Sequence, residues 1–468
     1  MPVGSVHNPL RVAVIGSGPA GFYAAEYLLA QDGLHVEVDM FDRLPTPFGL
    51  VRAGVAPDHP KIKSVTRVYD KVAARPGFRF RGNVEFGSHL AHEDLLEYFH
   101  AVIYCVGARS ERRMGIPREY LPGSHGASDF VGWYNAGPDQ RNLTFNLDGQ
   151  RAVVVGNGNV AIDVARILLL PPAELAQTDI AGHALRALSV SKVREVVILG
   201  RRGPAQAAFT YRELKELSER DDIDVIVNPA DVTLDPHSSF DNERNPDRGR
   251  DQVLGLLRDL AARGDRGNDR RLVLRFLTSP VAIEGREYVE GVEVVRNALY
   301  RDADGAMRAR ATDALEVIPA DLVFRAIGYQ GVGLPGVPFD PITATIPNDR
   351  GRVIDPLDGR PRRGEYVAGW IKRGPTGIIG TNKSDARESV DVLFADLRAD
   401  RLRHDVLPAR VFERFLGERQ AEVVSFADWE YLDARERAKG EELGRPRLKF
   451  ARVESMLRAL RERGKSDP

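Results

Sequence analysis

Apolar residues occur along this chain in short blocks, and the segments between the blocks are amphipathic or polar. The first blocks are VAVIG (12–16), VEVDMFD (36–42) and HAVIYCVGA (100–108). A second series runs from RAVVVG (151–156) through EVVILGRRG (195–203) and DVIVNP (224–229) to DLVFRAIGY (321–329). Short apolar runs that alternate with helical patterns are typical of βαβ units. We therefore predict an α/β protein with two parallel-sheet units.

Other parts of the chain show a more polar pattern. Residues 235–270 are of mixed charge, and we interpret them as a surface excursion around one amphipathic helix, LGLLRDLAAR (254–263). Residues 365–397 predict a strand, a loop and a long helix that begins at Gly377. The densely charged tail, from about residue 400 onward, predicts helices that pack on the rest of the protein rather than bind a partner.

The composition narrows the function classes. With 468 residues the chain is long enough for two or three domains. Hydrophobic residues make up 43% and charged residues 28%, as in soluble globular proteins, and the net charge of -1 gives no sign of nucleic-acid binding. The start of the chain does not resemble a secretory signal, and no apolar stretch approaches the roughly 20 residues of a membrane helix. We expect a cytoplasmic protein without membrane association.

Cys105 is the single cysteine of the chain. An internal disulfide, a redox pair of cysteines and a cysteine-ligated iron–sulfur cluster are therefore excluded within this chain. We interpret Cys105 as a small buried hydrophobe rather than a reactive thiol, because it lies inside an apolar strand pattern. No metal site is expected, so any redox chemistry must use a bound organic cofactor.

A glycine turn follows the first predicted strand. Gly16, Gly18 and Gly21 form the pattern G-x-G-x-x-G between a strand and a helix. The first glycine allows the tight turn, the second lets the backbone approach a pyrophosphate, and the third lets helix and strand pack closely. Asp42 ends the next strand, where it is either a ligand for ribose hydroxyls or an ordinary surface acid. Together these residues predict a dinucleotide site.

The same turn recurs in the second series of strands. Gly156, Gly158 and Ala161 give the variant G-x-G-x-x-A, again between strand and helix. The next strand ends in Arg201 and Arg202 rather than in an acid. Charge-assisted hydrogen bonds contribute roughly 1.5–3 kcal/mol each, so two guanidinium groups could select the 2′-phosphate of NADP. The alternative is a solvated pair of arginines at a strand end.

Two further acids follow this arginine pair. Glu213 and Glu216 lie three residues apart on one face of a predicted helix, and by spacing alone they are either surface charges or cofactor ligands. Two glycine turns imply two dinucleotides, and a nicotinamide together with a flavin is the pair that makes chemical sense. Hydride transfer between stacked rings needs proximity and exclusion of water more than an acid or a base. The electrons must then leave for an external acceptor.

Long segments of the chain resemble one enzyme family. They are GSGPAGFYAA, LPTPFGLVRAGVAPDHPKIK, GNGNVAIDVARILL, GRRGPAQAAFTYREL and WIKRGPTGIIGTNK, spread over nearly the whole length. The chain is similar to the adrenodoxin reductase-type ferredoxin–NADP reductases, in particular to the actinobacterial ones. The resemblance implies two Rossmann-like three-layer domains on the glutathione reductase-like flavoprotein plan. It also implies transfer of electrons from NADPH through FAD to a ferredoxin or a similar small iron–sulfur protein.

The resemblance also implies roles for individual residues. The family binds FAD at positions that correspond here to Gly16, Gly18, Pro19, Ala20, Gly21, Asp42, Leu50, Val84, Trp370, Gly377, Ile378 and Ile379. It binds NADP at positions that correspond to Asn157, Gly158, Asn159, Val160, Arg201, Arg202, Glu213 and Gly377. His59 and Glu216 match positions suggested to serve the active site. The family usually has glutamate where this chain has Asp42, one methylene shorter.

We expect a discontinuous layout for these domains. Residues 1–110 and 328–468 are predicted to form the FAD-binding domain, and residues 111–327 the NADP-binding domain. An acidic partner would meet a basic surface, for which Arg212, Lys215, Lys372 and Arg373 are candidates.

Two other functions remain open at this point. The chain could be an electron-input subunit of a larger complex, like the small subunits of glutamate synthase, although those carry cysteines for iron–sulfur clusters. It could also be a nonenzymatic NADP sensor that keeps the fold without the flavin.

Overall fold

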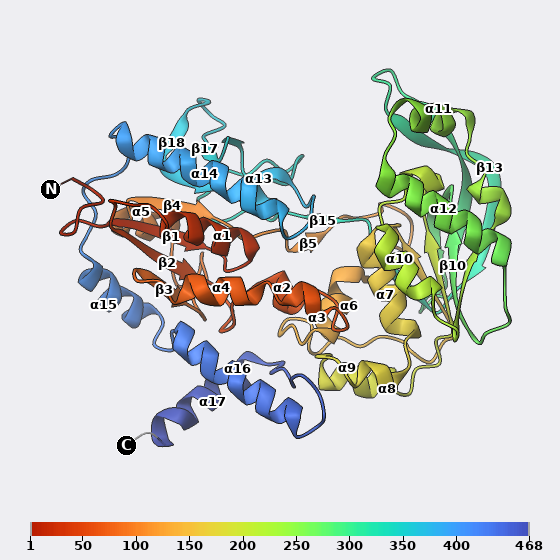
Figure 1. Ribbon diagram of the computed structural model, residues 1–468, viewed down its shortest axis with the longest axis horizontal. Coiled ribbons are helices and arrows are strands. Elements are labelled where there is room, and N and C mark those ends of the chain that lie inside the picture. The colour runs from red at the N-terminus through yellow and green to blue at the C-terminus, as the bar shows by residue number, and fades with distance from the viewer. Residues whose placement is uncertain (1, 467–468) are drawn as a thin grey trace. The chain divides into compact units, whose positions relative to one another are not determined.

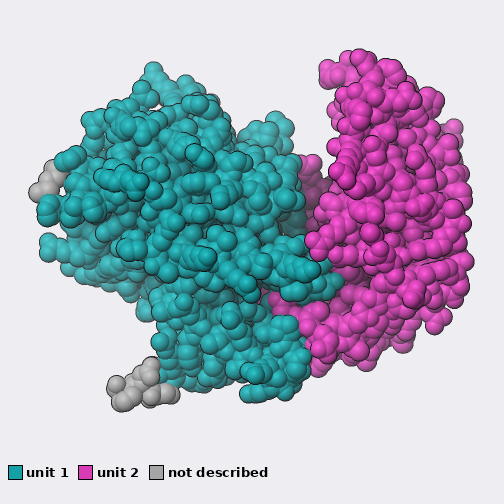
Figure 2. All heavy atoms as spheres, in the orientation of Figure 1, with its two compact units in different colours: residues 1–110, 329–468 teal, residues 111–328 magenta. Residues whose placement is uncertain are grey.

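The computed structural model describes residues 2–466. Contacts between residues divide the chain into two compact units, which Figure 2 shows in two colours. Unit 1 comprises residues 1–110 and 329–468, and unit 2 comprises residues 111–328. Unit 1 is therefore built from two separate segments of the sequence. Which cofactor each unit binds stays a prediction.

The described part of unit 1 is built on a seven-stranded sheet with the order β16-β17-β18-β4-β1-β2-β3. Strands β18, β4, β1, β2 and β3 are parallel, and β16 and β17 add an antiparallel edge. The strands are β1 (Leu10–Ile15), β2 (Val36–Phe41), β3 (Phe78–Arg81), β4 (Ala101–Tyr104), β16 (Asn348–Asp349), β17 (Arg352–Ile354) and β18 (Pro361–Val367). Strands β5 (Ser110–Glu111) and β15 (Tyr329–Gln330) form a separate two-stranded sheet.

Helices cover both faces of this sheet, because its central strands are apolar on both sides. One core joins Val12 and Val14 of β1 to α1 (Pro19–Leu28), α4 (Thr66–Ala73) and α14 (Thr381–Arg398). The opposite core joins Ala13 and Ile15 to α5 (His92–Tyr98) and α15 (Ala409–Arg419). Helices α1 and α14 run side by side on one face (Figure 1). Short helices α2 (Leu50–Ala53), α3 (Pro60–Lys63) and α13 (Trp370–Arg373) lie in the connections.

The C-terminal tail is helical, as the sequence predicts. Helices α16 (Phe426–Glu441) and α17 (Val453–Ser466) follow α15, and Trp429, Leu432 and Met456 are buried in the core of unit 1. A buried ion pair ties the tail to the N-terminal segment. Both guanidinium Nη atoms of Arg52 donate to the carboxylate of Glu436, at 2.9 and 2.5 Å, and that side chain is 0% exposed. The carboxylate of Glu436 also accepts hydrogen bonds from the amide of Phe450 (2.7 Å) and from Nη1 of Arg447 (3.3 Å).

The described part of unit 2 has a six-stranded parallel sheet with the order β6-β14-β7-β8-β10-β9. The strands are β6 (Ser124–Gly126), β7 (Arg151–Val155), β8 (Glu195–Leu199), β9 (Ile223–Val227), β10 (Arg270–Arg275) and β14 (Leu322–Arg325). The helices are α6 (Ala127–Tyr134), α7 (Asn159–Leu169), α8 (Pro172–Leu175), α9 (Gly182–Leu188), α10 (Tyr211–Ser218), α11 (Pro236–Arg244) and α12 (Arg248–Arg263).

A second, antiparallel sheet adds a third layer to unit 2. It consists of β11 (Thr278–Glu284), β12 (Gly291–Arg301) and β13 (Met307–Pro319). Ile283, Val292 and Ile318 from this sheet pack against Val153 and Val197 of the parallel sheet. The sequence pattern did not predict this layer.

Two helix predictions need correction. Residues 235–270 contain two helices, α11 and α12, not one. The first begins because the carboxylate of Asp235 accepts hydrogen bonds from the amides of His237 and Ser238 (3.0 Å each) and Pro236 occupies the first helical position. Helix α14 begins at Thr381, not at Gly377, because Gly377 has a left-handed conformation (φ 79°) that starts a turn.

Within the described residues, no helix is long and apolar enough to cross a membrane.

The buried pair of Arg52 and Glu436 yields a stability prediction. Glu436→Ala leaves a buried guanidinium and the Phe450 amide without this acceptor, so we expect it to lower the free energy of unfolding by about 3–5 kcal/mol. Urea unfolding followed by circular dichroism measures the change. Glu430→Ala, on the exposed face of the same helix, is the control and should change stability by less than about 0.5 kcal/mol. Equal stabilities of the two variants would contradict the anchoring role.

Candidate dinucleotide-binding sites

The first glycine turn lies at the carboxyl edge of the unit 1 sheet, between β1 and α1. Gly16 has φ 106°, and a Cβ at this position would lie 2.5 Å from the carbonyl oxygen of Cys105. A Cβ on Gly21 would lie 2.2 Å from the carbonyl oxygen of Gly16. The neighbouring backbone therefore excludes any side chain at these two positions.

Gly18 is different, because a Cβ there would meet nothing within 4 Å. Its φ of -78° is open to any residue, so neither conformation nor packing in this chain demands glycine. The position faces open space at the N-terminus of α1, whose first turn holds no acid. A bare backbone beside free helix amides fits the close approach of a pyrophosphate.

Asp42 directly follows β2, beside this turn. Its Oδ2 accepts hydrogen bonds from the amide (3.2 Å) and hydroxyl (2.5 Å) of Ser17, and its Oδ1 accepts one from the amide of Leu44 (3.0 Å). The carboxylate thus fixes the backbone of the turn, a role that the sequence did not indicate. The lone pairs that these bonds leave free could accept hydrogen bonds from ribose hydroxyls.

The other residues predicted to contact FAD differ in exposure. Leu50 begins α2 and is 39% exposed, whereas Val84 is buried and its amide donates to the carbonyl of Asp42 (2.9 Å). Ile378 is 72% exposed, and Ile379 packs against the core beside α1. An apolar side chain as exposed as Ile378 is suited to cover a flat ligand.

Trp370 provides a further test of whether the residues fit a bound cofactor. Its indole Nε1 is buried, and no hydrogen-bond acceptor for it occurs among the described residues. A buried donor without an acceptor is costly, so such a group indicates a missing partner. Together with the open space at Gly18, this donor makes unit 1 fit a bound dinucleotide.

The expectation that Lys372 belongs to a docking surface is wrong. Its side chain is 6% exposed, and its Nζ pairs with Asp385 (3.1 Å) and Glu388 (2.7 Å) of α14. Arg373 is also turned inward, with hydrogen bonds to Thr376 and to Asn382 Oδ1 (3.0 Å). Sequence alone could not show this, because the acids that hold both cations lie on the following helix.

The second glycine turn has the same geometry in unit 2, between β7 and α7. Gly156 has φ 117°, and a Cβ there would lie 2.3 Å from the carbonyl oxygen of Ala326. A Cβ on Gly158 would meet nothing within 4 Å, and its φ is -97°. The first turn of α7 also holds no acid. In both units the first glycine of the turn is therefore crowded and the second faces open space.

The loop after Arg202 braces this second turn. The carbonyl of Asn157 accepts hydrogen bonds from the amides of Ala208 and Phe209 (3.0 Å each). The Oδ1 of Asn159 accepts one from the amide of Thr210 (2.8 Å). Asn159 is thus a structural clamp as well as a predicted NADP residue.

Arg201 and Arg202 directly follow Gly200 at the end of β8, with their backbones held in place. The carbonyl of Arg201 accepts from Asn297 Nδ2 (2.8 Å), and the carbonyl of Arg202 accepts from the amide of Leu277 (3.0 Å). Asn297 lies on β12, about 100 residues away in sequence, and no sequence signal indicated it.

The two guanidinium groups have no carboxylate partner among the described residues. Burial lowers the pKa of Arg202, and the charges of Arg201 and Arg308 lower it further. Arg308 itself pairs with Asp302 (2.7 Å), so Arg201 and Arg202 are the two neighbouring cations without a carboxylate partner in the described part of the chain, an arrangement that favours an anion. This is the charge distribution expected for a 2′-phosphate site.

The predicted acids of α10 have different surroundings. Glu213 is buried, and its Oε2 accepts a hydrogen bond from Nη1 of Arg166 (3.1 Å). The Nη2 of Arg166 donates to Asp163 (2.6 Å). Glu216 is exposed and pairs with Arg212 (3.0 Å). His59, in unit 1, is partly buried at the start of α3. The roles of these residues at a cofactor stay predictions.

Cys105 is buried directly after β4, as predicted. Burial raises the pKa of its thiol well above the usual value, so the reactive thiolate is disfavoured.

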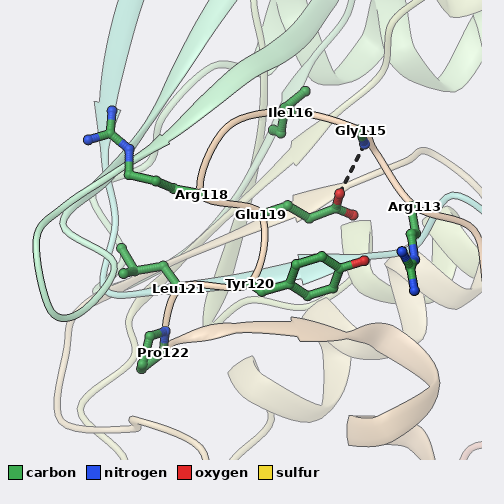
Figure 3. Close-up of a pocket in the computed structure, with 8 residues that line it drawn as sticks. All are labelled: Arg113, Gly115, Ile116, Arg118, Glu119, Tyr120, Leu121 and Pro122. Atoms are coloured by element: carbon green, nitrogen blue, oxygen red, sulfur yellow. Dashed lines mark hydrogen bonds between the residues drawn. The ribbon is translucent and has the colours of Figure 1, made fainter.

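A hollow in unit 2 contains none of the predicted site residues. It measures ≈ 570 Å³, and the residues that line it are Arg113, Gly115, Ile116, Arg118, Glu119, Tyr120, Leu121 and Pro122 (Figure 3). Figure 3 shows Glu119 bonded to the amide of Gly115 (2.9 Å) and Tyr120 directed towards Arg113. Glu119 also accepts a hydrogen bond from the amide of Met114 (2.7 Å) and pairs with Arg325 (3.6 Å). Its carboxylate therefore already has partners within the protein.

Each unit has an open glycine turn at the carboxyl edge of its parallel strands, a geometry typical of oxidoreductases that bind dinucleotides. The sequence model of the family described as pyridine nucleotide-disulphide oxidoreductase matches residues 10–230. The chain is 48% identical to the NADPH-ferredoxin reductase FprA of Mycobacterium leprae, over 97% of this chain and 98% of that protein. The chain belongs to the adrenodoxin reductase-type ferredoxin–NADP reductases, and the predicted fold class is confirmed.

Two further similarities extend over the same length. The mitochondrial NADPH:adrenodoxin oxidoreductase of Arabidopsis thaliana is 39% identical, over 97% of this chain and 95% of that protein. The structure of Mycobacterium tuberculosis FprA in complex with NADPH superposes with a TM-score of 0.91 at 48% identity, over 97% of this chain and 100% of that one.

The unpaired arginines generate a prediction on cofactor choice. Arg201→Ala with Arg202→Ala should weaken NADPH binding roughly 100-fold or more and change NADH binding little, because only NADPH carries the 2′-phosphate. Isothermal titration with each nucleotide measures both affinities. Arg186→Ala, an exposed arginine on α9, is the control and should leave both unchanged. Equal losses for the two nucleotides would mean that Arg201 and Arg202 are structural.

Proposed function

We propose that this protein is a ferredoxin–NADP(+) reductase that passes electrons from NADPH through FAD to a ferredoxin or a similar small iron–sulfur protein. The observation that carries the proposal is the repeated glycine turn, with an acid beside the first and two unpaired arginines beside the second. The relatives named for NADPH, ferredoxin and adrenodoxin cover almost the whole chain, which supports the same reaction. We further propose that unit 1 holds FAD and unit 2 holds NADP(H).

Bound FAD would accept a hydride from NADPH and release the electrons singly to the iron–sulfur partner. The contribution of this chain is to bind and orient. In unit 1, Gly18 and the amides of α1 would hold the pyrophosphate, and Trp370 would donate its free indole N–H to the cofactor. In unit 2, Gly158 and the amides of α7 would hold the second pyrophosphate, while Arg201 and Arg202 would take the 2′-phosphate.

Among the candidate docking cations, Arg212 and Lys215 remain available on α10. Their side chains are 62% and 44% exposed, and each lies beside an acid one turn on, at 3.0 Å for Glu216 and 3.4 Å for Glu219. Exposed pairs of this kind are weak, so an acidic partner could compete for the cations. The cytoplasmic location stays a prediction from the sequence.

Two other functions are weaker. A subunit of the glutamate synthase type would carry cysteines for iron–sulfur clusters, and this chain has only Cys105. A nonenzymatic NADP sensor would not need the free indole donor and open turn of unit 1. Flavin absorbance in the purified protein would exclude the sensor.

The proposal predicts the result of an anaerobic stopped-flow experiment. NADPH should bleach the flavin far faster than NADH, and oxidised ferredoxin should then restore the oxidised spectrum. Arg212→Glu with Lys215→Glu should raise the KM for ferredoxin severalfold and leave the reduction of a small artificial acceptor unchanged, because only the protein partner is charged over a large surface. A flavin that NADPH reduces but ferredoxin leaves reduced would contradict the proposed acceptor. Unchanged ferredoxin kinetics in the variant would contradict the docking surface alone.

A further inference from the structure

The glycine-rich segment 374–380 of unit 1 contains Gly377, Ile378 and Ile379, three of the residues expected to contact FAD. It connects α13 to α14 and includes Gly374, Gly377 and Gly380. Gly374 and Gly377 have positive φ angles of 80° and 79°. A segment with this much glycine loses a large conformational entropy when it is fixed, so its conformation must be set by contacts on either side.

Asp385, in the second turn of α14, makes those contacts on the side of α13. Its Oδ2 accepts a hydrogen bond from the amide of Gly369, the residue before α13, at 2.5 Å. Its Oδ1 pairs with Nζ of Lys372 at 3.1 Å and lies 3.8 Å from Nε of Arg373. One carboxylate of α14 thus holds the start and the end of α13. The side chain is 7% exposed, so these bonds are shielded from solvent.

Lys372 and Arg373 extend this contact in two directions. Lys372 Nζ also donates to Ser389 Oγ (3.2 Å) and Glu388 Oε2 (2.7 Å) on α14. Arg373 donates to the carbonyl and hydroxyl of Thr376, inside the glycine-rich segment itself. The chain of contacts therefore runs from α14, through Asp385 and the two cations, into the segment.

The same cluster borders the first glycine turn. A Cβ on Gly369 would lie 2.7 Å from the Cβ of Ala20, in the first turn of α1. Burial raises the pKa of the Cys105 thiol, the charge of Asp385 raises it further and that of Lys372 lowers it; Cys105 is the residue whose carbonyl crowds Gly16. The amide that Asp385 holds is thus packed against the helix expected to bind the pyrophosphate.

We propose that Asp385 is a positioning residue for FAD, which holds the segment 374–380 and the Gly369 amide in the conformation that receives the cofactor. The inference rests on the proposed function, because it takes FAD as the ligand of unit 1. A buried ion cluster gains little stability over an apolar one of similar size, since removing its charges from water is costly. Its use here is geometric, in that one carboxylate fixes two backbone segments at once.

Two isosteric substitutions separate this role from simple pairing with Lys372. In Asp385→Asn, the side-chain carbonyl can accept from Gly369 or from Lys372 but not from both, because the second atom becomes a donor. The matched control is Glu388→Gln. Glu388 is 47% exposed and also pairs with Lys372, but it makes no hydrogen bond to the Gly369 amide, which Asp385 holds. Only the first substitution breaks the link between α14 and the two ends of α13.

The test is titration of the apoproteins with FAD. Binding is monitored through the quenching of flavin fluorescence and the shape of the visible absorption band. We expect Asp385→Asn to raise the Kd for FAD on the order of tenfold, the equivalent of one charged hydrogen bond, and Glu388→Gln to change it less than about twofold. Bound FAD in Asp385→Asn should also be less quenched, because the segment no longer packs in one conformation. A Kd and a quenching equal to those of the wild type, or an equal loss in both variants, would overturn the inference.

Two controls keep the outcome interpretable. If Asp385→Asn does not fold, as judged by circular dichroism of the apoprotein, Asp385→Glu takes its place. It keeps the negative charge that pairs with Lys372 but moves the carboxylate by one methylene relative to the Gly369 amide, so the Kd for FAD must again rise relative to Glu388→Gln. If the wild-type apoprotein itself does not bind FAD, the proposed function fails. A wild type that binds FAD with variants that bind it equally well defeats the inference alone.

Discussion

The close approach of backbone to backbone at the carboxyl edge of a parallel sheet is the constraint on which the rest of this structure depends. At Gly16 and at Gly156 a Cβ would collide with the carbonyl oxygen of the residue directly after the adjacent strand, Cys105 or Ala326. The chain must therefore turn there without a side chain, and the turn points the N-terminus of the next helix towards open space at Gly18 and Gly158. This geometry suits the binding of a phosphate, because the first amides of a helix have no partner within the helix.

The two units use the same turn but supply different charges beside it. In unit 1 the neighbouring strand ends in Asp42, whose carboxylate is bonded to Ser17 and Leu44. In unit 2 the corresponding strand ends in Arg201 and Arg202, whose charges have no partner among the described residues. The two turns thus have similar backbone geometry, and we propose that the residues at the end of the neighbouring strand select the dinucleotide.

Much of the site could be predicted because its signals are local in sequence. The glycine patterns, the acid and the arginines each lie within a few residues of a strand end, and the resemblance to a family covers the same segments. Features that depend on distant segments could not be predicted. In the sequence Lys372 reads as an exposed cation, and only the fold shows that it pairs with Asp385 and Glu388. The sequence also has no local signal that relates Asn297, on the antiparallel sheet, to Arg201. Likewise, the start of α14 at Thr381 depends on the left-handed conformation of Gly377.

The most direct test of two separate dinucleotide sites is the affinity for NADP⁺ and the FAD content of a Gly158→Leu variant. The substitution adds a side chain where a Cβ meets nothing within 4 Å and where φ suits any residue, so the fold should be retained. The account predicts a protein that keeps its full complement of FAD and loses most of its affinity for NADP⁺, because the new side chain occupies the place of a phosphate. A variant that binds NADP⁺ as tightly as the wild type would contradict the assignment of the second turn, and with it the central claim.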